Sequence, residues 1–194
     1  MEEKREMLTI KSGQEGRFRW AAVSAMLLAI GAILRLVSPS IAGISPNWII
    51  AMYCLAIVLF RPSIGRAVGI GLVAGALCLA TSKSVFPYGN LISEPVGALV
   101  CAAIVGLPLT MKLGRVDLRP AAGALCGTLA SGLTFTTLAK LILGLPLKVY
   151  LYGMLPVVLT VAAANTIIAQ LLYYPVAALI CGLPGKDKEE GISK

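Results

Sequence analysis

Six apolar stretches divide this chain, and its Lys and Arg residues fall on alternate sides of them. The stretches cover residues 20–37, 48–60, 64–82, 95–111, 120–144 and 150–181. Thirteen of the 17 basic residues lie on the N-terminal flank, at the second and fourth connections, or on the C-terminal flank, whereas the other three connections hold Lys83 and Lys148. Positive charge accumulates on the cytoplasmic side of membrane proteins. The pattern predicts an all-α integral membrane protein with six transmembrane helices and both termini in the cytoplasm.

The composition agrees with this fold class. Hydrophobic residues make up 58% of the chain and charged residues 13%, which is far too apolar for a water-soluble domain. Most stretches supply the roughly 20 residues that cross a bilayer core of about 30 Å. The stretch 48–60 is short, so we expect it to extend into 41–47, to tilt, or to be sheltered by neighbours. The stretch 150–181 is long, and we expect a tilt or a break near Pro175.

These boundaries predict three parts. Residues 1–19 form a cytoplasmic N-terminal tail, residues 20–183 a six-helix membrane domain, and residues 184–194 a cytoplasmic C-terminal tail. The expected location is the cell membrane, as a multi-pass protein.

The residues that the chain lacks exclude most enzyme classes. It contains no His, and Glu94 and Asp117 are the acidic residues between Gly16 and Gly185. Metal-dependent hydrolysis, paired-carboxylate catalysis and His-assisted nucleophilic catalysis all need groups that are missing inside the membrane. The five cysteines form no CxxC pair, and no phosphate-binding loop occurs. We predict no catalytic residue, no metal and no cofactor, so ATP hydrolysis would have to come from another subunit.

Small residues recur at intervals of about four in three of the stretches, a spacing that lets transmembrane helices pack closely. For the third and fifth stretches, internal packing is the favoured interpretation; these residues are Ala67, Gly71, Gly75, Gly123, Gly127 and Ser131. For the first stretch, internal packing and an interface with another subunit stay equally open; its residues are Ala21, Ala25, Ala29 and Ala32.

Polar and aromatic residues collect at the level of one membrane leaflet. The predicted topology puts Arg35, Glu94 and Lys140 at the outer side, together with Asn47, Asn90, Trp48, Phe86 and Tyr88. Snorkelling cations and an interfacial aromatic belt are the simpler explanation for most of them. Glu94 fits this explanation less well, because it is the one carboxyl group at that level. Asn165, near the middle of the last stretch, also needs a partner or a ligand.

Several segments resemble one known family. The Ala-rich first stretch, with the sequence Ala25-Met-Leu-Leu-Ala29-Ile-Gly-Ala-Ile-Leu34, resembles that of substrate-binding (S) components of energy-coupling-factor (ECF) transporters. Within that group the chain is most similar to the tryptophan-specific S components. The segments that carry this likeness are Pro46-Asn47, 55–60, Phe86-Pro-Tyr-Gly-Asn-Leu91, Leu155-Pro156, Asn165-Thr166 and Tyr174-Pro175.

The resemblance implies a bacterial substrate-capture subunit with an outward-facing site, and it implies tryptophan as the substrate. It also implies that the alanine face of the first helix docks on a transmembrane coupling subunit bound to two ATPases. From the residues themselves, Glu94 and either Arg35 or Lys140 suit the ammonium and carboxylate of an amino acid. An indole would fit an aromatic slot with one acceptor, for which the candidates are Phe86, Tyr88, Trp48, Phe135 and Asn165.

Three alternatives stay open at this point. The chain could be an S component for another aromatic or vitamin-like substrate. It could also be a self-sufficient secondary transporter, although the two halves show no clear sequence repeat of the kind that inverted-repeat transporters carry. A membrane assembly or scaffold protein is the third alternative.

Overall fold

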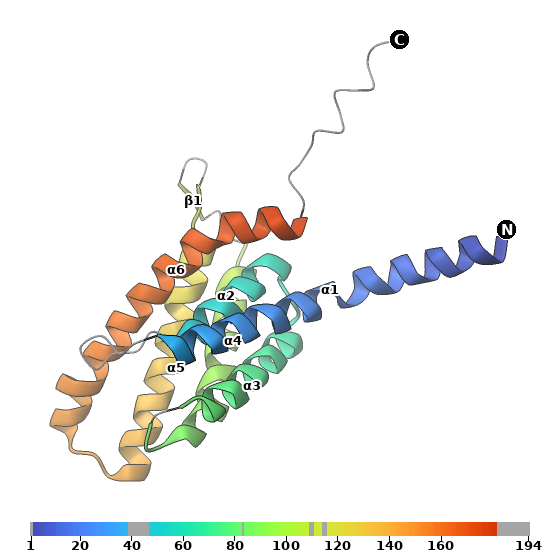
Figure 1. Ribbon diagram of the computed structural model, residues 1–194. Helices are drawn as coiled ribbons and strands as arrows, with labels where there is room; N and C mark the ends of the chain where they lie inside the picture. The colour runs from blue at the N-terminus through green and yellow to red at the C-terminus, as the bar shows by residue number, and fades with distance from the viewer. Residues whose placement is uncertain (1, 39–46, 83, 109–110, 114–115, 182–194) are drawn as a thin grey trace.

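A computed structural model describes residues 2–38, 47–82, 84–108, 111–113 and 116–181 of this chain, with the backbone alone for 2–17, 113 and 181. The predicted C-terminal tail, 184–194, lies outside the described residues. The fold is all-helical apart from one small hairpin (Figure 1). Its elements are α1 (Glu2–Val37), α2 (Trp48–Phe60), α3 (Ile64–Ala80), the 3-10 turn η1 (Pro87–Gly89), α4 (Asn90–Gly106), β1 (Lys112–Leu113), β2 (Val116–Asp117), α5 (Arg119–Leu143), the π-helical turn η2 (Val149–Met154) and α6 (Leu155–Cys181).

Within the described residues, four helical segments are long and apolar enough to cross a membrane. They are Phe18–Val37, Pro87–Gly106, Arg119–Leu143 and Val149–Ile180. The helices α2 and α3 are apolar but shorter. The structure thus confirms a helical protein with segments suited to crossing a membrane, whereas the crossing of all six helices remains a prediction.

The short helix α2 lies in the centre of the bundle. Every residue from Ile49 to Val58 is buried, and α2 contacts α1, α3, α4, α5 and α6. Of the three ways in which we expected this stretch to fit a bilayer, shelter by its neighbours is confirmed. Its continuous apolar sequence follows from burial on all sides, since a helix that is hydrophobic all round has no face for solvent.

Small residues hold α3, α4 and α5 together at short range. A methyl group added at Gly71 of α3 would lie 2.6 Å from the Cα of Pro95 in α4. One added at Gly97 of α4 would lie 2.8 Å from the Cβ of Ser131 in α5. Larger side chains would force these helices apart, so the predicted internal packing of the third and fifth stretches is confirmed.

Several element boundaries differ from the sequence-based expectation. We expected the fourth helix to start at Pro95, but α4 runs from Asn90 to Gly106 with Pro95 inside it. Pro95 is the sixth residue of α4, so it leaves the carbonyl oxygen of Leu91 without the N–H that would normally bond to it in the helix. The hairpin β1–β2 was not predicted; it pairs Lys112 with Asp117. Near its C-terminal end α6 bends, and Pro175 lies within that helix (Figure 1).

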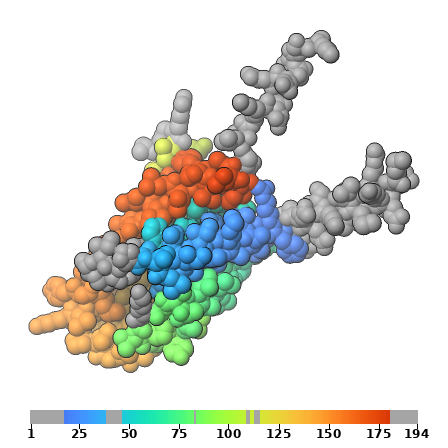
Figure 2. All heavy atoms as spheres, viewed as in Figure 1, coloured from blue at the N-terminus to red at the C-terminus, as the bar shows by residue number. Residues whose placement is uncertain are grey.

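The helix α1 lies along the surface of the bundle. Figure 2 shows it between α6 and α3. Gly31 faces inward, because a methyl group there would lie 3.0 Å from the Cα of Ile49 in α2. Ala25 and Ala29 are exposed, whereas Ala21 and Ala32 are half-buried. The alanine pair is therefore not buried against this chain's own helices.

Candidate functional site

A cavity of about 420 Å³ lies among the helices, near the end of the bundle that carries the connection between α3 and α4. This volume is in the range of small-molecule binding sites. One part of its wall is polar and consists of Arg35, Asn47, Ser82, Ser84, Asn90, Ser93, Glu94, Thr128, Ser131 and Thr136. The rest is formed by small or apolar residues, which are Ile50, Gly132, Phe135, Gly153, Met154, Val157, Val158 and Val161.

Glu94 lies at the polar part of the cavity wall and is only 1% exposed. Tyr53 and Ser131 donate hydrogen bonds to its Oε2, over 3.2 and 3.0 Å. Asn47 donates from Nδ2 to Oε1 over 3.2 Å, and the Cys78 thiol lies 3.5 Å from the same oxygen. Among the described residues, no Lys or Arg forms an ion pair with this carboxyl group. Within the described part of the chain, Glu94 is thus held by neutral donors and not by a cation.

Arg35 reaches the same region from α1 without touching Glu94. Its Nη1 donates to the Oδ1 of Asn47 over 2.7 Å, and the Sγ of Cys78 lies 3.3 Å from the same nitrogen. Asn47 stands at the N-cap position of α2, but its side chain makes no capping bond. It instead bridges Arg35 and Glu94. This bridge keeps a basic and an acidic group close together.

The apolar part of the cavity lies against α5 and α6. Phe135 of α5 faces Phe86 of the loop, with ring centroids 6.2 Å apart. A methyl group added at Gly132 would lie 2.7 Å from Val158, so α5 and α6 meet closely here. The loop before α4 also contributes, since Ser82 and Ser84 line the cavity. A bulky apolar group could therefore lie among valine, methionine and phenylalanine side chains.

The predicted site residues divide into two groups. Arg35, Asn47, Asn90 and Glu94 come together at the cavity, and Phe86 supports its wall through Phe135. The others do not line it. The ammonium of Lys140 lies 5.9 Å from the centre of the Tyr150 ring, and Trp48 donates from its indole nitrogen to Ser38. Tyr88 is 67% exposed.

Asn165 lies behind the cavity wall. It is fully buried, and its Nδ2 donates over 3.3 Å to the hydroxyl of Thr128, which does line the cavity. Its Oδ1 has no hydrogen-bond partner in the described part of the chain. The sequence predicted that this amide needs a partner. The structure supplies one for the amide nitrogen, but none among the described residues for the amide oxygen.

Sequence reasoning missed the buried hydroxyl groups of this site. Ser93, Thr128 and Ser131 line the cavity, and the hydroxyl of Tyr53 contacts Glu94. A signal was present: Asn90, Ser93 and Gly97 share one face of α4, and Thr128 and Ser131 share one face of α5. Two polar faces on neighbouring membrane helices indicate a shared polar interior.

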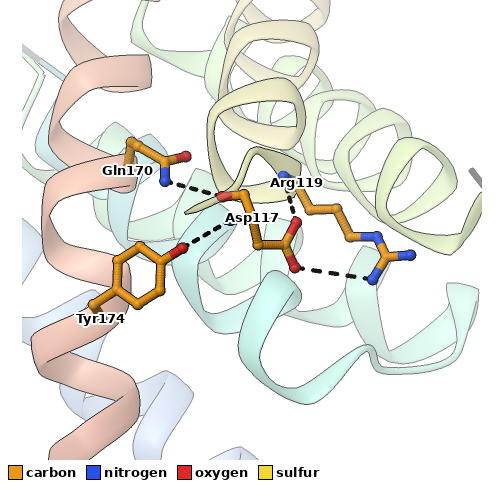
Figure 3. Close-up of polar contacts among 4 residues, drawn as sticks. All are labelled: Asp117, Arg119, Gln170 and Tyr174. Carbon is orange, nitrogen blue, oxygen red and sulfur yellow. Dashed lines mark hydrogen bonds and ion pairs between the residues drawn. The ribbon is translucent and has the colours of Figure 1, made fainter. Parts of the chain in front are cut away.

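Asp117, the other acidic residue of the membrane domain, lies at the opposite end of the bundle, by the hairpin. Its backbone N–H donates to the Tyr174 hydroxyl over 2.8 Å, and Gln170 donates to its backbone oxygen over 3.0 Å (Figure 3). Its carboxylate accepts the N–H of Arg119 over 3.0 Å and lies 3.9 Å from the guanidinium of that residue. These bonds tie the hairpin to α6 and leave Asp117 a structural role.

Comparison with known proteins gives one consistent match. The family model described as tryptophan transporter TrpP matches residues 18–182. A "Probable tryptophan transport protein" of Bacillus subtilis (strain 168) is 32% identical over 162 residues, which cover 81% of this chain and 90% of the relative. A protein of the same name from Clostridium perfringens is 31% identical over 162 residues, covering 78% of this chain and 87% of the relative. No solved structure matches this chain significantly.

Proposed function

Because the chain belongs to the tryptophan transporter TrpP family, we propose that it captures tryptophan at the outer face of a bacterial cell membrane for uptake driven by an ECF module. The resemblance to tryptophan-specific S components is confirmed at the level of the family. The relatives carry the names of transport proteins, not of enzymes. Beyond membership of the family, we propose tryptophan as the substrate, an ECF module as the partner, and capture of the substrate at the outer face of the membrane.

One observation carries the substrate proposal: Glu94 is a buried carboxyl group at a cavity, with neutral donors around it and no ion-pair partner among the described residues. A buried charge needs an opposite charge nearby, and an amino acid supplies an ammonium. Arg35, held two hydrogen bonds away through Asn47, suits the carboxylate on the same ligand carbon. The indole then lies among Phe135, Val157 and Val158.

Binding measurements on the purified chain test this assignment. We expect calorimetric binding of tryptophan, weaker binding of indole-3-propionate, which lacks the ammonium, and weaker binding of tryptamine, which lacks the carboxylate. Each loss should be about tenfold or more, the usual effect of removing a charged hydrogen-bonding group. Equal affinity for all three ligands would contradict the assignment of Glu94 and Arg35.

The docking proposal rests on the exposed alanines of α1. Close helix approach needs small side chains, and Ala25 and Ala29 are exposed on the surface of α1. Ala25→Trp or Ala29→Trp should abolish uptake in cells that contain the coupling subunit and both ATPases, while tryptophan binding to the isolated protein stays unchanged. Leu72→Trp, at an exposed position of α3, is the matched control. Parallel loss of binding and uptake would instead place these alanines in internal packing.

Transport by the chain alone decides between an S component and a self-sufficient transporter. Purified protein in vesicles without ATP should bind tryptophan but should not accumulate it under an ion gradient. Accumulation under these conditions would reject the need for an ECF module and leave tryptophan as the substrate.

The six-span topology has its own test. Val85, in the connection between α3 and α4, is 91% exposed, Leu147, between α5 and η2, is 58% exposed, and Val116, in the hairpin, is 42% exposed. Cysteines introduced at Val85 and Leu147 should react with an impermeant thiol reagent in intact cells, whereas one at Val116 should react only after lysis. Labelling at Val116 from outside would overturn the topology.

A further inference from the structure

Hydroxyl groups on the helices of this chain fall into two sets. In the first set the hydroxyl donates to the carbonyl oxygen four residues earlier in its own helix, as in Thr134, Thr136, Thr160 and Thr166. This bond is the usual way in which Ser and Thr satisfy themselves inside a membrane helix. These hydroxyl groups already donate to an acceptor in their own helix, so they do not need a ligand as acceptor.

The second set lines the cavity, as Thr136 of the first set also does, but its hydroxyls make no such bond to the backbone of their own helix. Ser131 donates to Glu94, and Thr128 accepts from Asn165. Ser93 has no hydrogen-bond partner among the described residues, although it is fully buried and lines the cavity. A buried hydroxyl without a partner costs free energy, and such groups in native structures call for an explanation.

The position of Ser93 shows which part of a ligand it meets. Ser93 and Gly97 share one face of α4, and Gly97 packs against Ser131 of α5. Ser93 therefore faces α5, where Gly132 meets Val158 of α6. Glu94, about 100° further around the helix, contacts Tyr53 of α2, Cys78 of α3 and Ser131 of α5. Ser93 thus lines the cavity next to its charged part, and the apolar residues of α5 and α6 line the same cavity.

Resting on the proposed function, we propose that the Ser93 hydroxyl accepts a hydrogen bond from the ring N–H of the substrate and so selects indole over aromatic side chains that lack a ring donor. The ring N–H is a donor with no acceptor capacity, and it needs one acceptor inside an otherwise apolar slot. Of the other two candidates, Asn165 does not line the cavity, and Thr128 already accepts a bond from it. Ser131 and Thr136 also line the cavity, but each already donates a hydrogen bond within the protein. Among the lining hydroxyl groups of the described helices, Ser93 is the one that makes no hydrogen bond.

The test compares tryptophan with 3-benzothienylalanine, an analogue of nearly the same shape in which sulfur replaces the ring N–H. The wild-type chain should bind tryptophan about two- to tenfold more tightly than the analogue, which corresponds to one neutral hydrogen bond. Ser93→Ala should remove this preference by weakening tryptophan binding alone. Ser93→Cys, with a weaker acceptor, should give an intermediate ratio.

Controls separate the role of Ser93 from general packing. The ligand-free Ser93→Ala protein should unfold at the same temperature as the wild type or slightly higher, because the removed hydroxyl was unsatisfied. Thr134→Val removes a hydroxyl that is bonded to its own helix and should leave the ratio of the two affinities unchanged.

Several outcomes would overturn the assignment of Ser93. Equal weakening of both ligands by Ser93→Ala would place the hydroxyl at the amino-acid head group, and no weakening of either would remove it from the site. Equal wild-type affinity for both ligands would show that the ring N–H is not recognised, while leaving tryptophan capture intact. Failure of the wild-type chain to bind either ligand would reject the proposed function itself.

Discussion

Glu94 and Asp117 carry the two carboxyl groups of the membrane domain, and their surroundings differ. Asp117 binds groups close to it in sequence or on α6, including the backbone N–H and the guanidinium of Arg119. Glu94 gathers donors from α2, α3 and α5, borders a cavity, and lies one residue from an unsatisfied hydroxyl. A carboxylate paired within its own segment stabilises the fold, whereas one held by neutral groups from several helices leaves an interaction for a ligand to complete.

Among the substitutions proposed below, Glu94→Gln should have the largest effect, and this effect should be on tryptophan binding. The change keeps the size of the side chain but removes its charge, so tryptophan affinity should fall about tenfold to a hundredfold, the range for hydrogen bonds to charged groups. Isothermal titration calorimetry measures the loss. A variant that binds tryptophan normally but unfolds more easily would make Glu94 a structural residue like Asp117.

Phe86→Ala should give a smaller loss at the same end of the bundle. Phe86 supports Phe135 in the cavity wall, and aromatic pairs contribute about 0.5–1.5 kcal/mol, or roughly two- to tenfold in affinity. Titration with tryptophan and with a small amino acid such as alanine would show whether the loss is specific to large aromatic ligands. Equal affinity of wild type and variant for tryptophan would remove the loop from the site.

Asp117→Ala should leave binding unchanged and lower stability instead. The change removes the bond to the Arg119 N–H and the longer contact with its guanidinium, so the free energy of unfolding should fall by about 0.5–1.5 kcal/mol. Thermal unfolding in detergent measures this effect. Reduced tryptophan affinity in this variant would show that the two ends of the bundle are coupled.

Tyr174→Phe should give the smallest effect. It removes the hydroxyl that accepts the backbone N–H of Asp117 and leaves the ring in place, and that N–H can still reach water at this exposed position. We expect a loss of about 0.5 kcal/mol in unfolding free energy, at the lower end for a single hydrogen bond. A larger loss, matching Asp117→Ala, would show that the hairpin depends mainly on its contact with α6.

The sequence predicted helices better than contacts. It placed α2 at its observed limits and α5 within one residue, because hydrophobic length and flanking charge report insertion into a membrane directly. It missed the start of α4 by five residues, since Pro95 looked like a helix start and instead lies inside the first turns. The hairpin β1–β2 gave no signal, because two residues on each strand are too few for a periodic pattern.

For the candidate site, charge was predictable and orientation was not. Arg35, Asn47, Asn90 and Glu94 could be grouped by depth in the membrane, and the structure places all four at the cavity. Lys140 has the right depth but lies over Tyr150, because depth does not specify the direction in which a side chain points. Ser93 and Thr128 are too common in membrane helices to stand out until their bonding partners are known.

The burial of α2 has a consequence for how the protein is made. At about 1.5 Å per residue its 13 residues extend for about 20 Å, less than a bilayer core, so it is a weak insertion signal by itself. Two of the helices that cover it, α5 and α6, leave the ribosome last. During synthesis α2 must therefore be held beside α1, or by the insertion machinery, until the second half of the chain arrives. Chains that stop before α5 would leave this helix uncovered and should be degraded by membrane quality-control proteases.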